Sequence, residues 1–169
     1  KIGTLSTRLE NLIGDIEETA RIDAENDKVE EVNNTQKIEI IKEGLYTLIV
    51  DKEIEVITSL NDLKAIFIQK DIILRVLENL ISNAIKYSNP KRSNRFVKIE
   101  GKALNDKIEI LVSDNGLGIP KEFHDEAFGM FKRFHKSDAP GSGLGLYLVK
   151  KNLEKINGEI SLQSTSEGT

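Results

Sequence analysis

The sequence predicts an α+β fold, a two-layer α/β sandwich in which a mixed, mostly antiparallel sheet carries helices on one face, with a further helix at the N-terminus. Apolar residues recur at spacings of three and four in several long segments, which is the period of amphipathic helices. Shorter segments rich in β-branched residues lie between them and favour strands. With 169 residues, the chain is long enough for one core-bearing domain and an appendage.

The N-terminal part is expected to be helical. Residues 3–24 form an amphipathic pattern in which Leu5 and Leu9 share a face. The polar stretch 23–35 then indicates a linker or a fraying helix end. A second helix is expected over 35–50. The first helix is therefore predicted to lead into the main domain as a separate element.

Two strands and a long helix are expected next. The segments 53–60 and 64–68 carry strand-forming residues, and the Asn-Asp pair at 61–62 favours a turn between them. Helical periodicity then predicts a helix over 71–87. It should end at the Ser-Asn-Pro of 88–90, because the residue before a proline avoids helical geometry.

A hairpin, a helix and a last strand complete the expected order. The segments 95–104 and 107–114 alternate like paired strands around an Asn-Asp turn. A helix is expected over 143–156, ended by the Asn-Gly pair that follows it. Residues 158–164 predict a strand. The segment 128–142 between these elements is expected to be irregular.

Composition excludes several classes of protein. Charged residues of both signs make up 31% of the chain and the net charge is −4, so nothing indicates nucleic-acid binding. The absence of cysteine excludes disulfides and thiolate–zinc sites. No apolar run approaches the roughly 20 residues of a membrane span, and the charged helical N-terminus does not resemble a signal peptide. We expect a cytoplasmic domain, whether or not its parent protein is anchored in a membrane.

The segment NLISNAIKYS places polar residues along one side of a helix that otherwise looks buried. Asn79, Asn83, Lys86 and Tyr87 stand at i, i+4, i+7 and i+8, so they form one stripe. A solvated helix face is the commoner explanation of such a stripe. Asparagine is a poor helix former, however, and its neutral oxygen suits a hard cation already neutralised by phosphates. Lysine supplies a point charge for phosphate.

The segment VSDNGLGIP ends an apolar strand with a carboxylate and then two glycines. Asp114 could accept a hydrogen bond from the exocyclic amino group of adenine, whereas the carbonyl oxygen of guanine would repel it. Gly116 and Gly118 would let the backbone turn tightly beside the base. An Asx-turn with a glycine corner explains the same residues equally well.

The segment GSGLGLYLVKK opens an amphipathic helix with alternating glycines. Gly141, Gly143 and Gly145 would leave backbone N–H groups exposed at a positive helix end, which is an anion site. Close packing explains such a triplet as often. The segment lacks both the Lys-Ser/Thr ending of a Walker loop and the spacing of a dinucleotide-binding fingerprint.

The segment FGMFKRF combines aromatic and basic residues. Phe128, Phe131 and Phe134 recur at spacings of three and are expected to be core or anchoring residues. Lys132 and Arg133 beside them could reach a phosphate, and a solvated pair of charges is the equally good alternative.

Taken in order, these segments resemble the boxes of the ATP-binding domain of sensor histidine kinases, in the GHKL superfamily. NLISNAIKYS resembles the N box, DNGLG the G1 box, FGMFKRF the F box and GSGLGL the G2 box. The resemblance covers about 35–169 and implies a Bergerat-type ATP-binding fold. It implies two domains, part of a dimerisation and phosphotransfer hairpin with a linker over 1–32 and the catalytic domain over 33–169.

The resemblance implies ATP and Mg²⁺ as cofactors. Mg²⁺ would lie on Asn83, phosphate contacts would come from Asn79 and Lys86, Tyr87 would lie on the adenine side, and Asp114 would bind the adenine amino group. The other nucleotide-binding residues that it implies are Gly116, Gly118, Ile119, Gly141, Gly143, Leu144 and Gly145.

The implied reaction is transfer of the ATP γ-phosphoryl group to a histidine absent from this chain, with Arg133 and Lys132 as catalytic residues and a lid between the F and G2 boxes. The implied partners are a response regulator receiver domain and a second copy bound through the N-terminal hairpin. The His-acid-x-basic-x-Pro motif of the phosphoacceptor is missing. His124 and His135, the two histidines of the chain, are expected to be surface residues. The family usually has a closing strand after the final Glu-Gly-Thr, so both ends are expected to be truncated.

Two alternatives come from other classes. A GHKL ATPase would carry a glutamate general base where Asn79 stands. Glu78 is adjacent, but one residue rotates a helix position by about 100°, so Glu78 should not share the face of Asn83. A degenerate nucleotide-sensing module would have lost boxes, and these are intact.

Overall fold

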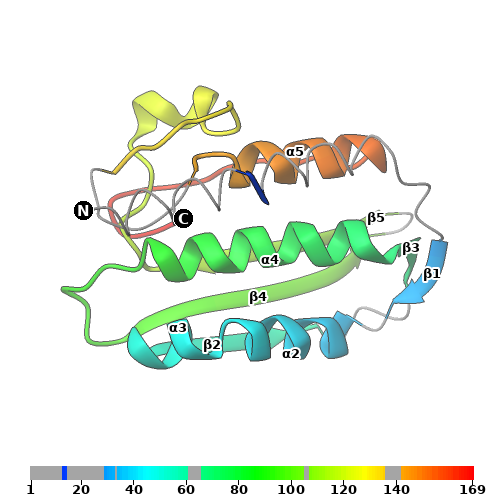
Figure 1. Cartoon of the computed structure of the whole chain (residues 1–169), viewed down its shortest axis with the longest axis horizontal. Helices are drawn as coiled ribbons and strands as arrows, with labels where there is room; N and C mark the ends of the chain where they lie inside the picture. The colour runs from blue at the N-terminus through cyan, green and yellow to red at the C-terminus, as the bar shows by residue number, and fades with distance from the viewer. Residues whose placement is uncertain (1–12, 15–28, 33, 61–65, 105–106, 136–141) are drawn as a thin grey trace.

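The computed structural model describes residues 13–14, 29–32, 34–60, 66–104, 107–135 and 142–169. Helices α2, α4 and α5 run roughly side by side, with the strands β2, β4 and β5 along one side of α4 (Figure 1). In chain order the elements are β1 (Val29–Val32), α2 (Asn34–Gly44), α3 (Tyr46–Asp51), β2 (Ile54–Ser59), β3 (Ile66–Gln69), α4 (Lys70–Lys86), β4 (Arg95–Leu104), β5 (Lys107–Asp114), the 3-10 helix η1 (Lys121–Glu126) and α5 (Gly145–Lys155).

The larger sheet has the strand order β2-β4-β5. β2 runs parallel to β4, and β4 pairs with β5 in an antiparallel hairpin, from Val97 opposite Asp114 to Leu104 opposite Lys107. The hairpin and the mixed character of the sheet are therefore confirmed. Its register brings the end of β5, with Asp114, level with the start of β4.

A second, two-stranded sheet pairs β1 with β3, from Val29 opposite Gln69 to Val32 opposite Ile66. The prediction of a linker over 23–35 was wrong at this point, because 29–32 form a strand. A four-residue strand depends on its partner more than on its own propensity, and here the partner lies more than thirty residues further along the chain. The prediction of a single sheet was also wrong for the described residues, which form two sheets.

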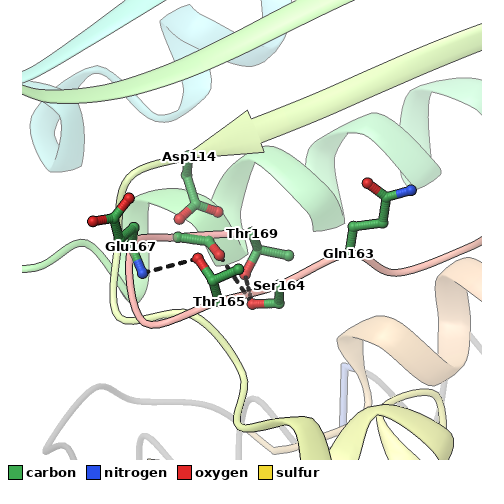
Figure 2. A pocket seen from close by; sticks show the side chains of 7 residues that line it. Asp114, Gln163, Ser164, Thr165, Glu167 and Thr169 are labelled. Carbon is green, nitrogen blue, oxygen red and sulfur yellow. Dashed lines mark hydrogen bonds between the residues drawn. The ribbon is translucent and has the colours of Figure 1, made fainter.

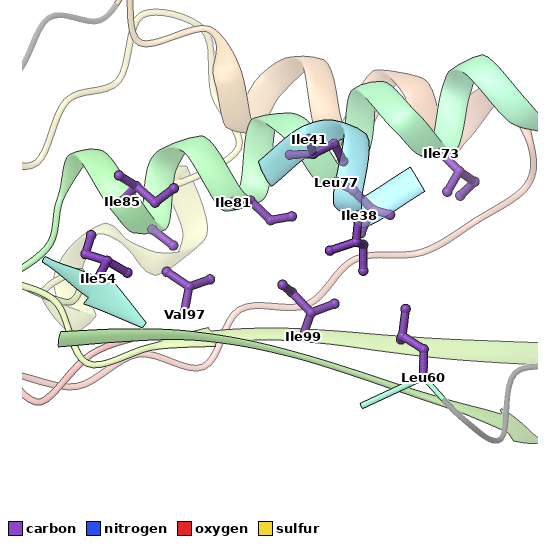
Figure 3. Close-up of a cluster of buried hydrophobic side chains, with 11 residues drawn as sticks. Ile38, Ile41, Ile54, Leu60, Ile73, Leu77, Ile81, Ile85, Val97 and Ile99 are labelled. Carbon is purple, nitrogen blue, oxygen red and sulfur yellow. The ribbon is translucent and has the colours of Figure 1, made fainter. Parts of the chain in front are cut away.

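The core lies between α4 and the larger sheet, with α2 closing one side. Side chains of α4 point toward those of β4, as Figure 3 shows. The eleven buried residues of this cluster are Ile38, Ile41, Ile54, Leu60, Ile73, Leu77, Ile81, Ala84, Ile85, Val97 and Ile99.

A second face of α4 packs against α5 through a smaller cluster. Ile72 and Val76 of α4 are buried with Val149 of α5. Covering α4 on two faces leaves one strip of its surface beside the start of α5. That strip carries the asparagines of the predicted polar stripe, which are half-buried.

The helix predicted over 35–50 is two helices. Leu45, between α2 and α3, has φ −102° and ψ 7°, which departs from helical geometry. Gly44 immediately before it weakens helix continuation because glycine has the largest backbone entropy to lose. The predicted helix over 3–24 lies outside the described residues except for 13–14, which are helical.

After α5 the structure differs from the prediction in one element and agrees with it in another. Residues 158–164 pair with no strand in the part of the chain that the structure describes, so the last predicted strand was wrong. Thr165 and Gly168 form a short bridge instead. The end of α5 is confirmed: Asn157 has φ 54°, and the Gly158 N–H donates to the Leu153 carbonyl at 2.8 Å. This is the Schellman geometry of helix ends.

No helix in the described ranges combines the length and apolarity needed to cross a membrane.

Replacing Asn152 with leucine is expected to stabilise the fold. Asn152 of α5 is fully buried, its Nδ2 donates to the Leu148 carbonyl at 2.9 Å, and its Oδ1 has no hydrogen-bond partner among the described residues. An unsatisfied buried acceptor costs about 1–3 kcal/mol, and leucine has the same branched outline without a polar atom. We expect the thermal midpoint to rise by about 2–4 °C per kcal/mol gained.

The matched control is Asn152→Asp, which keeps the shape but adds a charge to the same buried position. It should lower the midpoint because an unpaired buried carboxylate is costly. A midpoint lowered by Asn152→Leu, in thermal unfolding followed by circular dichroism, would show that Oδ1 has a partner in solution.

Candidate nucleotide-binding site

The two asparagines of α4 lie against the first turn of α5. A Cβ placed on Gly145 would be 3.2 Å from Asn79 Oδ1 and 3.3 Å from Asn83 Nδ2. The Asn79 Nδ2 donates to the Arg75 carbonyl at 3.1 Å, which fixes the amide with its oxygen toward Gly145. Residues from two predicted boxes, the N box and the G2 box, are therefore in contact, and the glycine keeps the space between them narrow but free of a side chain.

The end of α4 meets the loop that follows β5. The Leu117 N–H donates to the Tyr87 carbonyl at 3.0 Å, and a Cβ on Gly116 would be only 2.6 Å from that same oxygen. Asp114 Oδ1 accepts from the Gly116 N–H at 2.7 Å. The Asx-turn expected as an alternative is thus present, and it presents the carboxylate of Asp114 next to the end of the asparagine helix.

Burial raises the pKa of the Asp114 carboxyl, while the backbone hydrogen bonds from Gly116 and at Thr169 oppose the shift. No cation among the described residues contributes to the pKa of Asp114. A charged carboxylate in this partly buried position therefore destabilises the folded state. Such groups cluster at functional sites, so this shift supports a binding role for Asp114.

The C-terminal segment closes over Asp114, which sequence reasoning missed. A pocket of about 270 Å³ lies between Asp114 and the segment 163–169 (Figure 2). The Asp114 N–H donates to the Thr169 carbonyl at 2.8 Å, and the Ile119 N–H donates to Ser164 Oγ at 2.7 Å. The Ser- and Gly-rich composition of 164–169 signals a turn, but nothing in it indicates contact with a loop fifty residues earlier.

Gly118 and Gly143 are required by close packing. Gly118 has φ 64°, and a Cβ there would lie 1.7 Å from the Thr165 carbonyl oxygen. Gly143 has φ 81°, and its Cβ would lie 2.8 Å from the Phe131 carbonyl carbon. Both backbones occupy the left-handed region that favours glycine. The glycine triplet could reflect an anion site or close packing, and at Gly143 close packing by itself requires a glycine.

The remaining G2 residues lie at the start of α5. Leu144 is buried beside Leu148, and its N–H donates to Ser142 Oγ at 3.1 Å. The Leu144 side chain thus belongs to a small core cluster, and the next residue, Gly145, is the one that lies against the asparagines. Gly141 lies outside the described residues, as does the greater part of the predicted lid, 136–141.

The phenylalanines of the F box divide between packed and exposed positions. Phe134 packs on Phe123 with ring centroids 5.3 Å apart, whereas Phe131 is 58% exposed. The prediction that Phe131 is a core or anchoring residue was wrong. The segment is not helical, and a backbone φ of 60° at Phe131 turns its side chain outward. Lys132 forms an exposed ion pair with Glu126, and Arg133 is exposed.

Two histidines, both half-buried, hold the loop after β5 in place through hydrogen bonds that the expectation of surface residues did not foresee. His135 Nε2 lies 2.6 Å from the Gly118 carbonyl oxygen, and His124 Nε2 lies 2.8 Å from that of Ile119. A carbonyl only accepts, so each Nε2 must carry a hydrogen and donate it. The His135 ring also lies 6.0 Å from the Tyr87 ring, centroid to centroid.

Lys52 is a further residue that sequence reasoning missed. Its Nζ donates to the Lys86 carbonyl at 2.8 Å, which places a positive charge at the C-terminal end of α4. Burial, and then the nearby charge of Arg95, lower the pKa of Lys52. The contact holds the helix end from which Lys86 and Tyr87 project.

Comparison with known proteins is consistent with this arrangement. Residues 68–169 match the family described as "Histidine kinase-, DNA gyrase B-, and HSP90-like ATPase". The chain is 30% identical over 160 residues to the phytochrome-like protein Cph1 of Synechocystis sp., covering 92% of this chain and 20% of that protein. It is 30% identical over 164 residues to the sensor histidine kinase WalK of Bacillus subtilis, covering 90% of this chain and 26% of WalK.

Solved structures share the fold. Full-length ShkA in complex with AMPPNP superposes with a TM-score of 0.80 at 20% identity, over 96% of this chain and 34% of that one. The mycobacterial sensor histidine kinase MprB has a TM-score of 0.61 at 26% identity, over 75% of this chain and 80% of that one. A third structure, histidine kinase ThkA in complex with response regulator protein TrrA, has a TM-score of 0.75 at 22% identity, over 96% and 46% of the two chains.

The chain spans about a fifth to a quarter of the length of the two curated relatives named above. The family match covers more than half of this chain and all four predicted boxes, and the predicted α+β fold is confirmed. The chain therefore belongs to the histidine kinase-, DNA gyrase B- and HSP90-like ATPase family, and carries the ATP-binding catalytic domain found in sensor histidine kinases.

Proposed function

We propose that this chain is the catalytic part of a sensor histidine kinase, which transfers the γ-phosphoryl group of Mg-ATP to a histidine outside residues 1–169. The observation that carries the proposal is the contact of Asn79 and Asn83 with the first turn of α5. Amide groups there can bind a metal ion and phosphates without acting as a base. Glu78, the residue that an ATPase would need nearby, is exposed on α4.

The nucleotide would lie along the strip from α5 to the loop after β5. Asp114 would accept from the adenine amino group beside Tyr87, and Asn79 and Lys86 would contact phosphate. The backbones of Gly116, Gly118, Ile119, Gly141, Gly143, Leu144 and Gly145 would form the surrounding walls.

The described residues hold no cluster of three or more His, Cys, Asp or Glu side chains that could bind a metal ion. A magnesium ion bound mainly by phosphates and water needs only one or two protein oxygens, so an amide-lined site fits it. Asn83, beside Gly145, would supply that oxygen. When bound, Mg²⁺ neutralises charge on the phosphates.

Arg133 and Lys132 would stabilise charge on the transferred phosphoryl group. Both are exposed, and the Lys132 ion pair with Glu126 is of the exposed kind that contributes less than about 1 kcal/mol. Lys132 can therefore exchange Glu126 for phosphate at little cost.

Asn83→Ala is expected to weaken Mg-ATP binding by at least about tenfold, because it removes a metal ligand. Calorimetry with ATP in Mg²⁺ and in EDTA measures it, and the deficit should disappear in EDTA. Glu78→Gln is the matched control on the same helix, and it should bind Mg-ATP normally. Unchanged Mg-ATP affinity of Asn83→Ala would exclude Asn83 as the metal ligand.

The second candidate function is hydrolysis of ATP, and the Glu78→Gln variant tests it as well. If Glu78 acts as a general base, the chain should hydrolyse ATP without any acceptor, and Glu78→Gln should abolish that hydrolysis. The exposure of Glu78 leads us to expect no such activity in the unmodified chain.

The chain is expected to bind ATP without phosphorylating itself. The Nε2 atoms of His124 and His135 donate to backbone carbonyls, so only Nδ1 of each ring could attack phosphorus. Neither histidine lies in a His-acid-x-basic-x-Pro motif, whose acid would orient the ring. Adding an upstream helix that carries the phosphoacceptor histidine should restore transfer, and Arg133→Ala should then slow transfer more than it weakens binding. Stoichiometric acid-labile phosphate on His124 or His135, after incubation with labelled ATP, would contradict this expectation.

The proposed partners follow from the kinase assignment. ThkA, which shares the fold, was solved with a response regulator protein. We propose a response regulator receiver domain for this chain, and homodimerisation through an N-terminal hairpin of which 1–32 form part. We also propose that the catalytic domain extends over 33–169; β1, which precedes it, pairs with β3 inside it. We also propose a cytoplasmic location, where ATP and response regulators are found. We propose no nucleic-acid partner.

A further inference from the structure

We propose that Ser164 is a positioning residue for base recognition: its hydroxyl ties together both ends of the loop 114–119 and so fixes where the Asp114 carboxylate meets adenine. The inference rests on the proposed function and deepens it, because it concerns selectivity for adenine nucleotides at the same site.

The Ser164 hydroxyl uses its whole hydrogen-bonding capacity. Its Oγ lies 2.7 Å from the Ile119 nitrogen, 2.8 Å from Thr169 Oγ1 and 3.1 Å from the Gly168 carbonyl oxygen. A hydroxyl has one hydrogen and two lone pairs. The carbonyl of Gly168 can only accept, so the Ser164 hydroxyl donates its hydrogen to it. Ser164 Oγ then accepts from the Ile119 N–H and from the Thr169 hydroxyl. The hydroxyl is therefore held in one orientation.

These bonds reach both ends of the loop that carries the base-binding carboxylate. At one end, Ser164 accepts directly from Ile119. At the other end it contacts Thr169, whose carbonyl accepts from the Asp114 N–H at 2.8 Å. Figure 2 shows Ser164 and Thr169 on the C-terminal segment facing Asp114. A single side chain thus closes a loop of six residues onto one segment.

Packing around the loop makes this closure tight. Gly118 lies so close to the Thr165 carbonyl that no side chain fits between them, and the same holds for Gly168 against the Asp114 carbonyl, where a Cβ would be 1.9 Å away. The loop and the segment therefore form one packed unit. Without the Ser164 hydroxyl, the half-buried Ile119 N–H would lose its acceptor, and the loop would have to move to reach another.

Discrimination between adenine and guanine depends on the position of the Asp114 carboxylate, since hydrogen bonds weaken steeply with poor geometry. A loosened loop should therefore weaken ATP and ADP binding equally, because both carry the base, and should lower the preference for ATP over GTP. A residue that merely stabilised the fold would lower the thermal midpoint without altering that preference.

The test is calorimetry on the full 169-residue chain with ATP, ADP and GTP, with each protein well below its own thermal midpoint. Ser164→Ala is expected to weaken ATP and ADP binding by about tenfold and to reduce the ATP-over-GTP ratio by a similar factor. Ser164→Thr keeps the hydroxyl and should restore most of both. Ser166→Ala, an exposed serine in the same turn, should change neither.

The outcomes separate this inference from the function on which it rests. If the unmodified chain binds no ATP, the proposed function fails and the inference with it. If it binds ATP, but a folded Ser164→Ala keeps the full ATP-over-GTP ratio, only the inference is overturned. Should Ser164→Ala unfold, Thr169→Val removes the hydroxyl on the Asp114 side, and an unchanged ratio in that variant overturns it equally.

Discussion

Gly118→Ala is expected to abolish measurable binding of ATP and ADP. Gly118 has a φ of 64°, where an alanine is strained by about 1–2 kcal/mol. The larger effect is steric, because the new Cβ would lie 1.7 Å from the Thr165 carbonyl oxygen, which is backbone and cannot rotate away. The loop after β5 would have to separate from the C-terminal segment and carry Asp114 with it. We expect a loss of affinity of more than about a hundredfold.

The measurement is nucleotide titration alongside thermal unfolding, so that lost binding can be distinguished from lost folding. Gly44→Ala is the matched control, since nothing lies within 4 Å of a Cβ placed there, at the end of helix α2. It should leave binding unchanged and slightly raise the midpoint, because alanine restricts the unfolded chain. Normal ATP affinity in a folded Gly118→Ala protein would show that the loop and the C-terminal segment need not touch for binding.

Asp114→Asn is expected to weaken ATP binding by roughly ten- to a hundredfold, while it stabilises the free protein. A hydrogen bond to a charged group contributes about 1.5–3 kcal/mol, and asparagine offers a donor where the adenine amino group also donates. The same donor suits the carbonyl oxygen of guanine, so GTP should lose less affinity than ATP or gain some. The ratio of ATP to GTP affinity should therefore fall as well as the ATP affinity.

The stabilisation follows from the raised pKa of the Asp114 carboxyl. The ordinary pKa of an aspartic acid carboxyl is 3.8, and the folded protein raises the pKa of Asp114 above it. At pH below 3.8 the carboxyl is protonated and contributes to the stability of the fold. This contribution is lost as pH rises through the raised pKa, so at neutral pH the charged Asp114 opposes folding. The amide of the Asp114→Asn variant carries no charge, so the thermal midpoint of the variant should exceed that of the unmodified chain at pH 7 but not at pH below 3.8.

Asp125→Asn is the control for the loss of one negative charge, because Asp125 is exposed on η1. It should leave the nucleotide preference unchanged. Equal affinities for ATP and GTP in the unmodified chain would count against the role of Asp114 in base recognition.

Much of the fold follows from local pattern. The period of apolar residues predicted α4 and α5 nearly to their ends, and alternation predicted the hairpin of β4 and β5. Asn157 and Gly158 predicted the end of α5 because few residues accept the left-handed backbone needed there. The four boxes identified the family because their residue types are unusual for the elements that carry them, such as two asparagines on a half-buried helix face.

The tertiary structure alone decided which distant segments meet. The pairing of β1 with β3, the closure of Ser164 over the loop of Asp114 and the hydrogen bond from His135 to Gly118 join residues that no local pattern relates. Phe131 is another case: its spacing suits packing, but its side chain is exposed and its backbone, at φ 60°, lies close to Gly143. Period and propensity describe how a chain folds on itself locally, whereas a hydrogen bond between distant residues exists only once the core has fixed both partners in space.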